Sequence, residues 1–184
     1  MKKISLVILA GGRGTRLKKI TKRPKPLFEF KNIPFLQLQL NHFSKYNFSE
    51  IFILVGYKSN LFSKFKEKII NSIKIKVLKE TKPQGTGGAL YKLKNKIKND
   101  FIVINGDTYF PINITNFIRD KKNSFAHIAL VKNVNYKSNT SLVNLSINKN
   151  KIIYNNQSQL MNAGIYYFSK KIFKYLSKGS YSIE

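Results

Sequence analysis

The stretch ISLVILAGGRGTRLKKITKRPKPLF, residues 4–28, joins an uncharged apolar run to a glycine-rich turn. The run over residues 4–10 is rich in aliphatic and β-branched side chains, which predicts a strand covered on both faces. Three glycines fall within residues 11–14, and they let the backbone take positive φ angles and approach a ligand closely. The turn then brings backbone N–H groups, the hydroxyl of Thr15 and two arginines toward the same position, where they could bind one ligand. We therefore expect a strand that ends in a phosphate-binding turn.

The turn is not one of the two commonest phosphate loops. A P-loop has a lysine directly after its last glycine, and Thr15 stands there instead. A dinucleotide fingerprint needs a third glycine where this chain has Leu17. With Thr15-Arg16-Leu17 and then Pro24-Lys25-Pro26-Leu27, the stretch resembles the signature of the sugar-phosphate nucleotidyltransferases. Enzymes of that family join a nucleoside triphosphate to a sugar 1-phosphate.

Composition limits the alternatives. A chain of 184 residues with 42% hydrophobic residues suits one globular domain with a sizeable core. No apolar stretch approaches the roughly 20 residues needed to span a bilayer, so we expect no membrane partner. The run after Met1-Lys2-Lys3 leads into the glycine turn rather than a signal cleavage site. The absence of cysteine excludes disulfides and thiolate metal sites and agrees with a cytoplasmic protein.

The formal net charge of +26 raises nucleic acid as a partner. The basic residues are almost all lysines spread along the chain, with arginines only at positions 13, 16, 23 and 119. This distribution favours non-specific, salt-sensitive association with polyanions over specific nucleic-acid binding. Two of the arginines lie in the glycine turn, where a small polyphosphate is the simpler partner.

Strand-like runs that end in glycine alternate with helical patterns in the first two thirds of the chain. Strands are expected over residues 4–10, 50–56, 73–78 and 101–105, and helices over 34–46, 60–72 and 85–97. The alternation predicts an α/β fold, a Rossmann-like three-layer arrangement with a mostly parallel sheet flanked by helices. Ligands of such sheets bind beyond the carboxyl ends of the strands. Arg16, Gly85 and Asp107 should therefore meet at one edge.

From residue 124 the pattern changes to short strands with little helix between them. They are expected over residues 126–131, 141–147, 151–154 and 163–168, with a hairpin turn at 148–150 and a short helix at 170–176. We interpret this part as a mixed sheet that shapes the sugar pocket. No linker or repeat divides the chain, so residues 1–184 are treated as a single nucleotidyltransferase domain.

The resemblance extends over the whole chain and implies roles for individual residues. Arg16 matches the family's arginine on the triphosphate and Lys25 its lysine on the reacting phosphates, and both are the predicted catalytic residues. Gly106 and Asn162, the latter in Asn-Ala-Gly-Ile-Tyr, match positions that line the sugar site. The implied nucleotide contacts are Leu9, Ala10, Gly11, Gly12, Gly14, Thr15, Glu80 and Gly85.

The resemblance also implies Mg²⁺ as cofactor, held by Asp107 in Gly-Asp-Thr. A hard divalent ion takes one or two carboxylates together with phosphate oxygens and water. The chain has two other aspartates, of which Asp100 opens a predicted strand at its far end and Asp120 lies in a predicted polar turn. Asp107 directly follows an apolar strand and suits the role best.

Each assignment has a structural alternative. Arg16 could lie on the surface, Lys25 could simply occupy a turn, and Asp107 could cap the following segment. Asn162 could bond the backbone at a strand end, and Glu80 could be a solvated carboxylate.

Within the family, the turn PQGTGGAL (residues 83–90) and the form NGDT (105–108) are most similar to the heptose 1-phosphate guanylyltransferases. This implies GTP and D-glycero-α-D-manno-heptose 1-phosphate as substrates, an NDP-sugar and pyrophosphate as products, and a role in making cell-surface polysaccharide. The alternatives are a mannose 1-phosphate guanylyltransferase or another NDP-sugar pyrophosphorylase, and a nucleotide-sugar-binding module with impaired catalysis. Homo-oligomerisation is left open.

Two features depart from the family pattern. Many relatives carry a Glu-Lys pair before the Asn-Ala-Gly segment, and residues 152–157 hold neither residue. Relatives also continue to a further strand whose aspartate completes the metal site, whereas no aspartate follows Asp120 in this chain. Either the domain lacks a C-terminal strand and helix, or the metal is held by Asp107 and phosphates alone.

Overall fold

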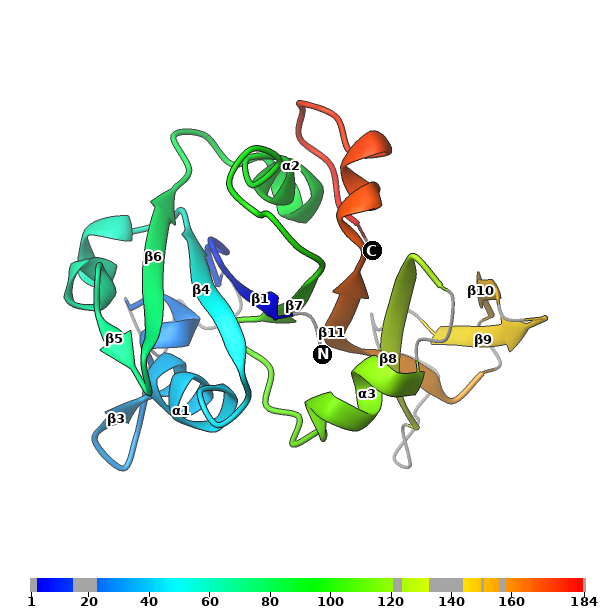
Figure 1. The fold of residues 1–184 in the computed structure, drawn as a ribbon, viewed down its shortest axis with the longest axis horizontal. Coiled ribbons are helices and arrows are strands. Elements are labelled where there is room, and N and C mark those ends of the chain that lie inside the picture. Colours follow the sequence, from blue (N-terminus) through cyan, green and yellow to red (C-terminus); the bar gives the residue numbers. More distant parts are fainter. Residues whose placement is uncertain are drawn as a thin grey trace.

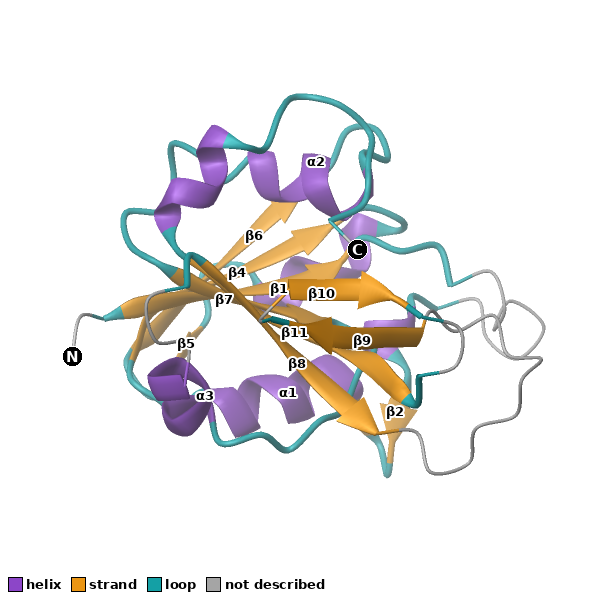
Figure 2. Cartoon of the chain, turned by 90° about the vertical axis from the view of Figure 1, so that its right-hand side faces the viewer, coloured by secondary structure: helices purple, strands orange, loops and turns teal. Residues whose placement is uncertain are grey.

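A mixed sheet forms the centre of the molecule, and helices cover both of its faces (Figures 1 and 2). The computed structural model describes residues 3–14, 23–120, 124–132, 144–149, 151–155 and 158–183. Four strands run parallel, in the spatial order β6-β4-β1-β7. They are β1 (Ile4–Ala10), β4 (Phe48–Val55), β6 (Ile73–Lys79) and β7 (Phe101–Asn105). Successive strands are added on one side of β1 until β7 returns to its other side, so the order reverses at β1.

Antiparallel strands extend this sheet at both sides. Beyond β7 lies β11 (Leu160–Phe168), which pairs with β7, with β8 (Ala126–Lys132) and with β9 (Asn144–Asn148). The strand β10 (Lys151–Tyr154) pairs with β9, and β5 (Ile69–Ile70) pairs with β6 at the opposite side. A separate two-stranded sheet joins β2 (Glu29–Phe30) to β3 (Ile33–Pro34). The strands beyond β7 therefore continue the sheet that the parallel strands begin.

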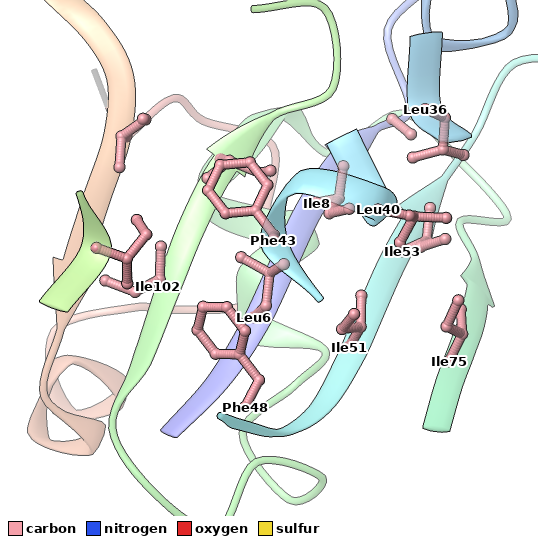
Figure 3. Packing of buried hydrophobic residues seen from close by; sticks show 14 of the residues in the cluster. Leu6, Ile8, Leu36, Leu40, Phe43, Phe48, Ile51, Ile53, Ile75 and Ile102 are labelled. Carbon is pink, nitrogen blue, oxygen red and sulfur yellow. The ribbon is translucent and has the colours of Figure 1, made fainter. Parts of the chain in front are cut away.

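The core lies in two layers, one on each face of the sheet. One layer packs under α1 (Phe35–Phe43), α3 (Ile114–Asp120) and the 3-10 helix η3 (Ser59–Phe65). The other packs under α2 (Gly85–Tyr91) and the 3-10 helix η4 (Lys170–Lys174). Alternate residues of β1 serve the two layers, since Leu6 and Ile8 join the first layer (Figure 3). Val7, which lies between them in the sequence, joins the second layer. Burial on both faces explains why this strand carries no charge.

The predicted α/β fold with a helix-flanked sheet is confirmed, and the four strands predicted in the first two thirds correspond to β1, β4, β6 and β7. The helix predicted over 34–46 is α1. The mixed sheet predicted after residue 124 is also present, although residues 141–143 and Asn150 lie outside the described part of the chain. The helix expected at 170–176 is the shorter η4. No helix in the described ranges is long and apolar enough to cross a bilayer.

The α-helix predicted over residues 60–72 is wrong. The chain enters this region through Lys58 at φ 49° and forms η3, in which Phe62 and Phe65 are buried. A 3-10 helix has three residues per turn, so this spacing places both rings on one face. Asn71 and Ser72 then both take positive φ and close a two-residue hairpin between β5 and β6.

Two further predictions need correction. The helix predicted over 85–97 ends as α2 at Tyr91, and the chain continues in tight turns in which Leu93 bonds back to Leu90. Asp120 does not lie in a polar turn, because it ends helix α3. The start of α3 carries a signal that sequence reasoning missed: the Asn113 side chain accepts a hydrogen bond from the Asn116 N–H, as N-cap residues do.

Candidate active site

A cleft of about 710 Å³ opens at the carboxyl ends of the parallel strands. It lies where the strand order reverses, which is where open α/β sheets bind ligands. Its walls come from the turn after β1, the turn after β4, the end of β6 with the following loop, the start of α2, and the turn after β7. They are formed by Leu9, Ala10, Gly11, Gly12, Arg13, Gly14, Lys25, Pro26, Leu54, Gly56, Tyr57, Glu80, Thr81, Pro83, Gln84, Gly85, Thr86, Ala89, Asn105 and Asp107.

Most of the predicted nucleotide contacts meet in this cleft. Leu9, Ala10, Gly11, Gly12 and Gly14 line it from the β1 side, and Glu80 and Gly85 line it from the opposite side. The predicted lysine and aspartate, Lys25 and Asp107, line it as well. Thr15 and Arg16 lie outside the described residues. Arg13, one of the two arginines of the glycine turn, is exposed and contributes to the same wall.

The glycines of the first turn serve two different purposes. A Cβ atom on Gly11 would lie 2.8 Å from Glu80 Oε2, and one on Gly56 would lie 3.0 Å from the same oxygen. These two glycines therefore make room for the Glu80 carboxylate. A Cβ on Gly12 would meet nothing within 4 Å. Packing does not require glycine at that position, so its open backbone is available for close approach by a ligand.

Glu80 directly follows β6 and is held at the cleft by a hydrogen bond from its backbone N–H to the Val55 carbonyl at 2.7 Å. Its Oε1 atom is buried and has no hydrogen-bond partner among the described residues. Burial raises the pKa of the Glu80 carboxyl above its ordinary value of 4.5, and nearby Lys92 offsets part of that rise. An unpaired buried acceptor is costly, and a ligand with N–H donors would satisfy it. The solvated carboxylate considered from the sequence does not describe this environment.

Lys25 and Asp107 pair across the mouth of the cleft. The Lys25 Nζ atom donates to Asp107 Oδ2 at 2.8 Å, and both side chains are partly exposed. Lys25 begins the short 3-10 helix η2 (Lys25–Leu27), where Pro26 and Leu27 are buried and anchor it. A Cβ on Gly14 would lie 3.0 Å from Lys25 Cγ, so this glycine, at φ +57°, lets the lysine stem pass.

A buried glutamine from α1 holds the turn that carries Asp107. The Gln39 side chain is 2% exposed, and its Nε2 atom donates to the carbonyls of Asn105 at 3.0 Å and Thr108 at 2.9 Å. These two bonds bracket Asp107 on both sides. Sequence reasoning gave Gln39 no role. A polar residue inside the apolar stripe of Leu36, Leu40 and Phe43 is the signal that could have found it.

The cation site implied by the resemblance has one protein ligand in view. Within the described ranges, no three His, Cys, Asp or Glu side chains gather where they could hold a metal ion. Asp107 is an exposed carboxylate on the cleft wall. Mg²⁺ commonly keeps several waters and takes one or two carboxylates with substrate phosphates. Asp107 thus fits Mg²⁺ that arrives with a triphosphate, and it does not form a closed metal cage.

The two predicted sugar contacts do not line the cleft. A Cβ on Gly106 would lie 2.7 Å from the Leu9 carbonyl oxygen, so glycine is needed there for packing against β1. Asn162 accepts a hydrogen bond from the Gly164 N–H at 2.8 Å and donates to the Tyr166 hydroxyl at 2.6 Å. These bonds lie where the register between β11 and β8 shifts. The backbone role considered for Asn162 is the one observed, and a sugar contact stays a prediction.

Several known proteins are similar to this chain over most of its length. The family model described as nucleotidyl transferase matches residues 5–183. The bifunctional protein GlmU of Methanococcus aeolicus is 37% identical over 178 residues, which cover 92% of this chain and 41% of that protein. The D-glycero-alpha-D-manno-heptose 1-phosphate guanylyltransferase of Campylobacter jejuni is 34% identical over 173 residues, covering 91% of this chain and 76% of that protein. The chain thus spans less than half of the bifunctional relative.

A solved structure shares the fold over almost the whole chain. HddC from Yersinia pseudotuberculosis, crystallised as a complex with GMP-PN, superposes with a TM-score of 0.80 at 32% sequence identity. The match covers 98% of this chain and 83% of that protein.

Proposed function

The chain belongs to the nucleotidyl transferase family, and on that premise we propose that it transfers a guanylyl group from GTP to a sugar 1-phosphate. The proposed acceptor is D-glycero-α-D-manno-heptose 1-phosphate, and the products are the GDP-sugar and pyrophosphate. The Campylobacter relative named for this activity supports the acceptor. The HddC structure with GMP-PN supports a nucleotide in the cleft. We further propose that the reaction takes place in the cytoplasm and supplies activated sugar for polysaccharide.

The observation that carries the choice of base is the carboxylate of Glu80 at the cleft, whose buried Oε1 atom has no hydrogen-bond partner among the described residues. A carboxylate only accepts hydrogen bonds and can accept two side by side. Among the four common bases, guanine alone presents two neighbouring N–H donors on its pairing edge, at N1 and the 2-amino group. Adenine and cytosine present one amino donor beside a ring acceptor, and uracil presents one ring N–H between two carbonyls. Glu80 is therefore matched to guanine.

The chemistry asks little of the protein beyond positioning and charge. The phosphate oxygen of the sugar 1-phosphate is already an anion, so it can attack the α-phosphorus of GTP without a general base. The new bond joins that oxygen to the α-phosphorus, the bond to the β-bridging oxygen breaks, and pyrophosphate leaves with the electron pair. In this scheme Lys25 neutralises the phosphates, and the backbone of the turn around Gly12 lies against them. Mg²⁺, when bound with the triphosphate at Asp107, adds positive charge beside the reacting phosphates.

The acceptor side is proposed to lie between the turn after β7 and strand β11. Gly164, at φ +69°, packs its backbone against the Asn105 side chain, so the bulge that contains Asn162 is next to the turn that carries Asp107. We propose that Gly106 and Asn162 border the sugar from this side. Arg16 is proposed to contact the triphosphate, as the family resemblance implies.

The test is a pyrophosphate-release assay with the four ribonucleoside triphosphates and a panel of sugar 1-phosphates, with and without Mg²⁺. The expected result is release that depends on Mg²⁺ and is fastest with GTP and heptose 1-phosphate. Fastest release with GTP and mannose 1-phosphate would keep the reaction and change the acceptor. Preference for another triphosphate would keep nucleotidyl transfer and change the nucleotide donor. If no pair releases pyrophosphate, the proposal is wrong.

A further inference from the structure

The segment after η4 folds back over the second glycine turn. We call residues 177–183 the strap and residues 84–88 the base turn. The strap, drawn in red in Figure 1, runs beside α2. The backbone N–H of Gly87 donates to the Tyr181 carbonyl at 3.0 Å, and the N–H of Tyr181 donates to the Gln84 carbonyl at 3.1 Å. Two main-chain hydrogen bonds therefore join the strap to the base turn on either side of Gly85.

The strap fills the space where side chains of the base turn would stand. A Cβ on Gly87 would lie 2.2 Å from Cε2 of the Tyr181 ring, and one on Gly85 would lie 2.3 Å from the Tyr181 carbonyl oxygen. A Cβ on Gly88 would lie 2.0 Å from the Gly179 carbonyl oxygen. Gly85 also takes φ +65°, which an L side chain would oppose. Contacts within the protein, rather than contacts with a ligand, therefore account for glycine at these three positions.

Further hydrogen bonds fix the strap itself. The Tyr181 hydroxyl accepts from the Ser177 N–H at 2.9 Å and lies 3.1 Å from the Ser177 carbonyl, to which it donates. The Ile183 N–H donates to Thr86 Oγ1 at 2.9 Å. The Tyr181 ring is therefore held in place at one end by its own strap while its edge lies over Gly87.

We propose that Tyr181 is a positioning residue for nucleotide binding. Gln84, Gly85 and Thr86 of the base turn line the cleft on the same side as Glu80. The ring of Tyr181 contacts this turn from outside the cleft, since the strap contributes no residue to the cleft wall among those described. Tyr181 thus acts through the base turn and sets the affinity for the triphosphate rather than for the acceptor. The inference rests on the proposed function, because it assumes that a nucleotide occupies this cleft.

The main test is a rescue experiment with Gly87→Ala, Tyr181→Ala and the double variant. Gly87→Ala is expected to lose most GTP binding, because its Cβ overlaps the Tyr181 ring. Tyr181→Ala leaves the base turn to be ordered by the ligand, and the cost of that ordering weakens binding. We expect the KM for GTP to rise about tenfold, with kcat and the KM for the sugar 1-phosphate changed less than twofold. The double variant should regain binding to the level of Tyr181→Ala alone.

Gly88→Ala is the matched control. Its Cβ would meet the backbone of Gly179, which Tyr181→Ala does not remove, so that pair should show no rescue. Tyr181→Phe keeps the ring over Gly87 and should bind GTP nearly as the parent does. If Gly87→Ala with Tyr181→Ala is as impaired as Gly87→Ala alone, the strap is not the reason for glycine at position 87, and the inference is overturned.

Amide hydrogen exchange separates this inference from the proposed function. Peptides that cover the base turn should exchange at least several-fold faster in Tyr181→Ala than in the parent, with no ligand present. Unchanged exchange would overturn the positioning role whatever the enzyme's substrates are. A parent protein that binds no nucleotide, together with faster exchange in Tyr181→Ala, would instead contradict the proposed function and keep the strap's hold on the base turn.

Discussion

Glu80→Gln tests the choice of base most sharply. The substitution keeps the size of the side chain but replaces one carboxylate oxygen by an NH₂ donor. That donor would oppose one of the two guanine N–H groups, while the remaining oxygen could still accept one bond. Losing a hydrogen bond to a charged group costs about 1.5–3 kcal/mol. At about 1.4 kcal/mol per factor of ten, GTP affinity should fall roughly 10- to 100-fold.

Although Glu80→Gln should weaken GTP binding, it should not lower the stability of the protein without ligand. Because burial raises the pKa of Glu80, the folded protein holds this proton more tightly than the unfolded chain does. The stability contributed by this group therefore falls as pH rises from the unfolded to the folded pKa. Glutamine removes the cost of burying the charge, so the melting temperature of Glu80→Gln at neutral pH should equal or exceed that of the parent.

Calorimetric titration with GTP and with ATP measures the effect, and Glu67→Gln, on an exposed residue outside the cleft, is the control. GTP affinity should fall for Glu80→Gln while ATP affinity changes little. In the parent, GTP affinity should also fall as pH decreases through the raised pKa of Glu80, and this dependence should be absent from Glu80→Gln. Equal losses for GTP and ATP, or no loss for GTP, would refute the role assigned to Glu80.

Three further substitutions test the other walls of the cleft. Gly12→Ala should keep its melting temperature, because its Cβ meets no protein atom, yet weaken triphosphate binding measurably by calorimetry; a stable variant that binds normally would contradict close approach of the phosphates. Gln39→Leu removes two buried hydrogen bonds at about 0.5–1.5 kcal/mol each, so it should lower thermal stability and raise the Mg²⁺ concentration needed for half-maximal turnover. Gln37→Leu on the same helix is the control. An unchanged Mg²⁺ requirement in Gln39→Leu would count against positioning of Asp107. Lys25→Met should reduce kcat about 10²- to 10³-fold, as loss of one transition-state donor does. Its melting temperature should be nearly unchanged, because the ion pair between Lys25 and Asp107 is partly exposed. A loss of folding comparable to the loss of rate would mean that Lys25 is structural.

The parallel half of the fold was predictable because β1, β4 and β7 are mostly buried on both faces, and β6 alternates apolar with polar residues. The run from Ile4 to Ala10 can hardly form anything else once it ends in glycine. After Lys58 the apolar periodicity led to the wrong prediction of an α-helix, since the spacing of Phe62 and Phe65 fits both an α-helix and a 3-10 helix. The positive φ angles at Lys58, Asn71 and Ser72 decide between them, and the local apolar pattern carries no signal of these angles.

The cleft was predictable where its residues follow strands, because the carboxyl ends of parallel strands share one edge. This reasoning predicted that Gly85 and Asp107 share one edge, and both line the cleft, whereas Arg16 of the same prediction lies outside the described residues. It could not find Gln39, whose bonding partners lie 66 and 69 residues away. Nor could it find Tyr181, because nothing local to the strap indicates that it returns to the glycines of the base turn.

The most direct test of guanylyl transfer is a single competition measurement. The protein is mixed with heptose 1-phosphate, Mg²⁺ and equal concentrations of GTP, ATP, UTP and CTP, and the nucleotide sugars formed are weighed by mass spectrometry. We predict GDP-heptose as the dominant product. Absence of any nucleotide sugar, or a dominant product that carries another base, would contradict the proposed function.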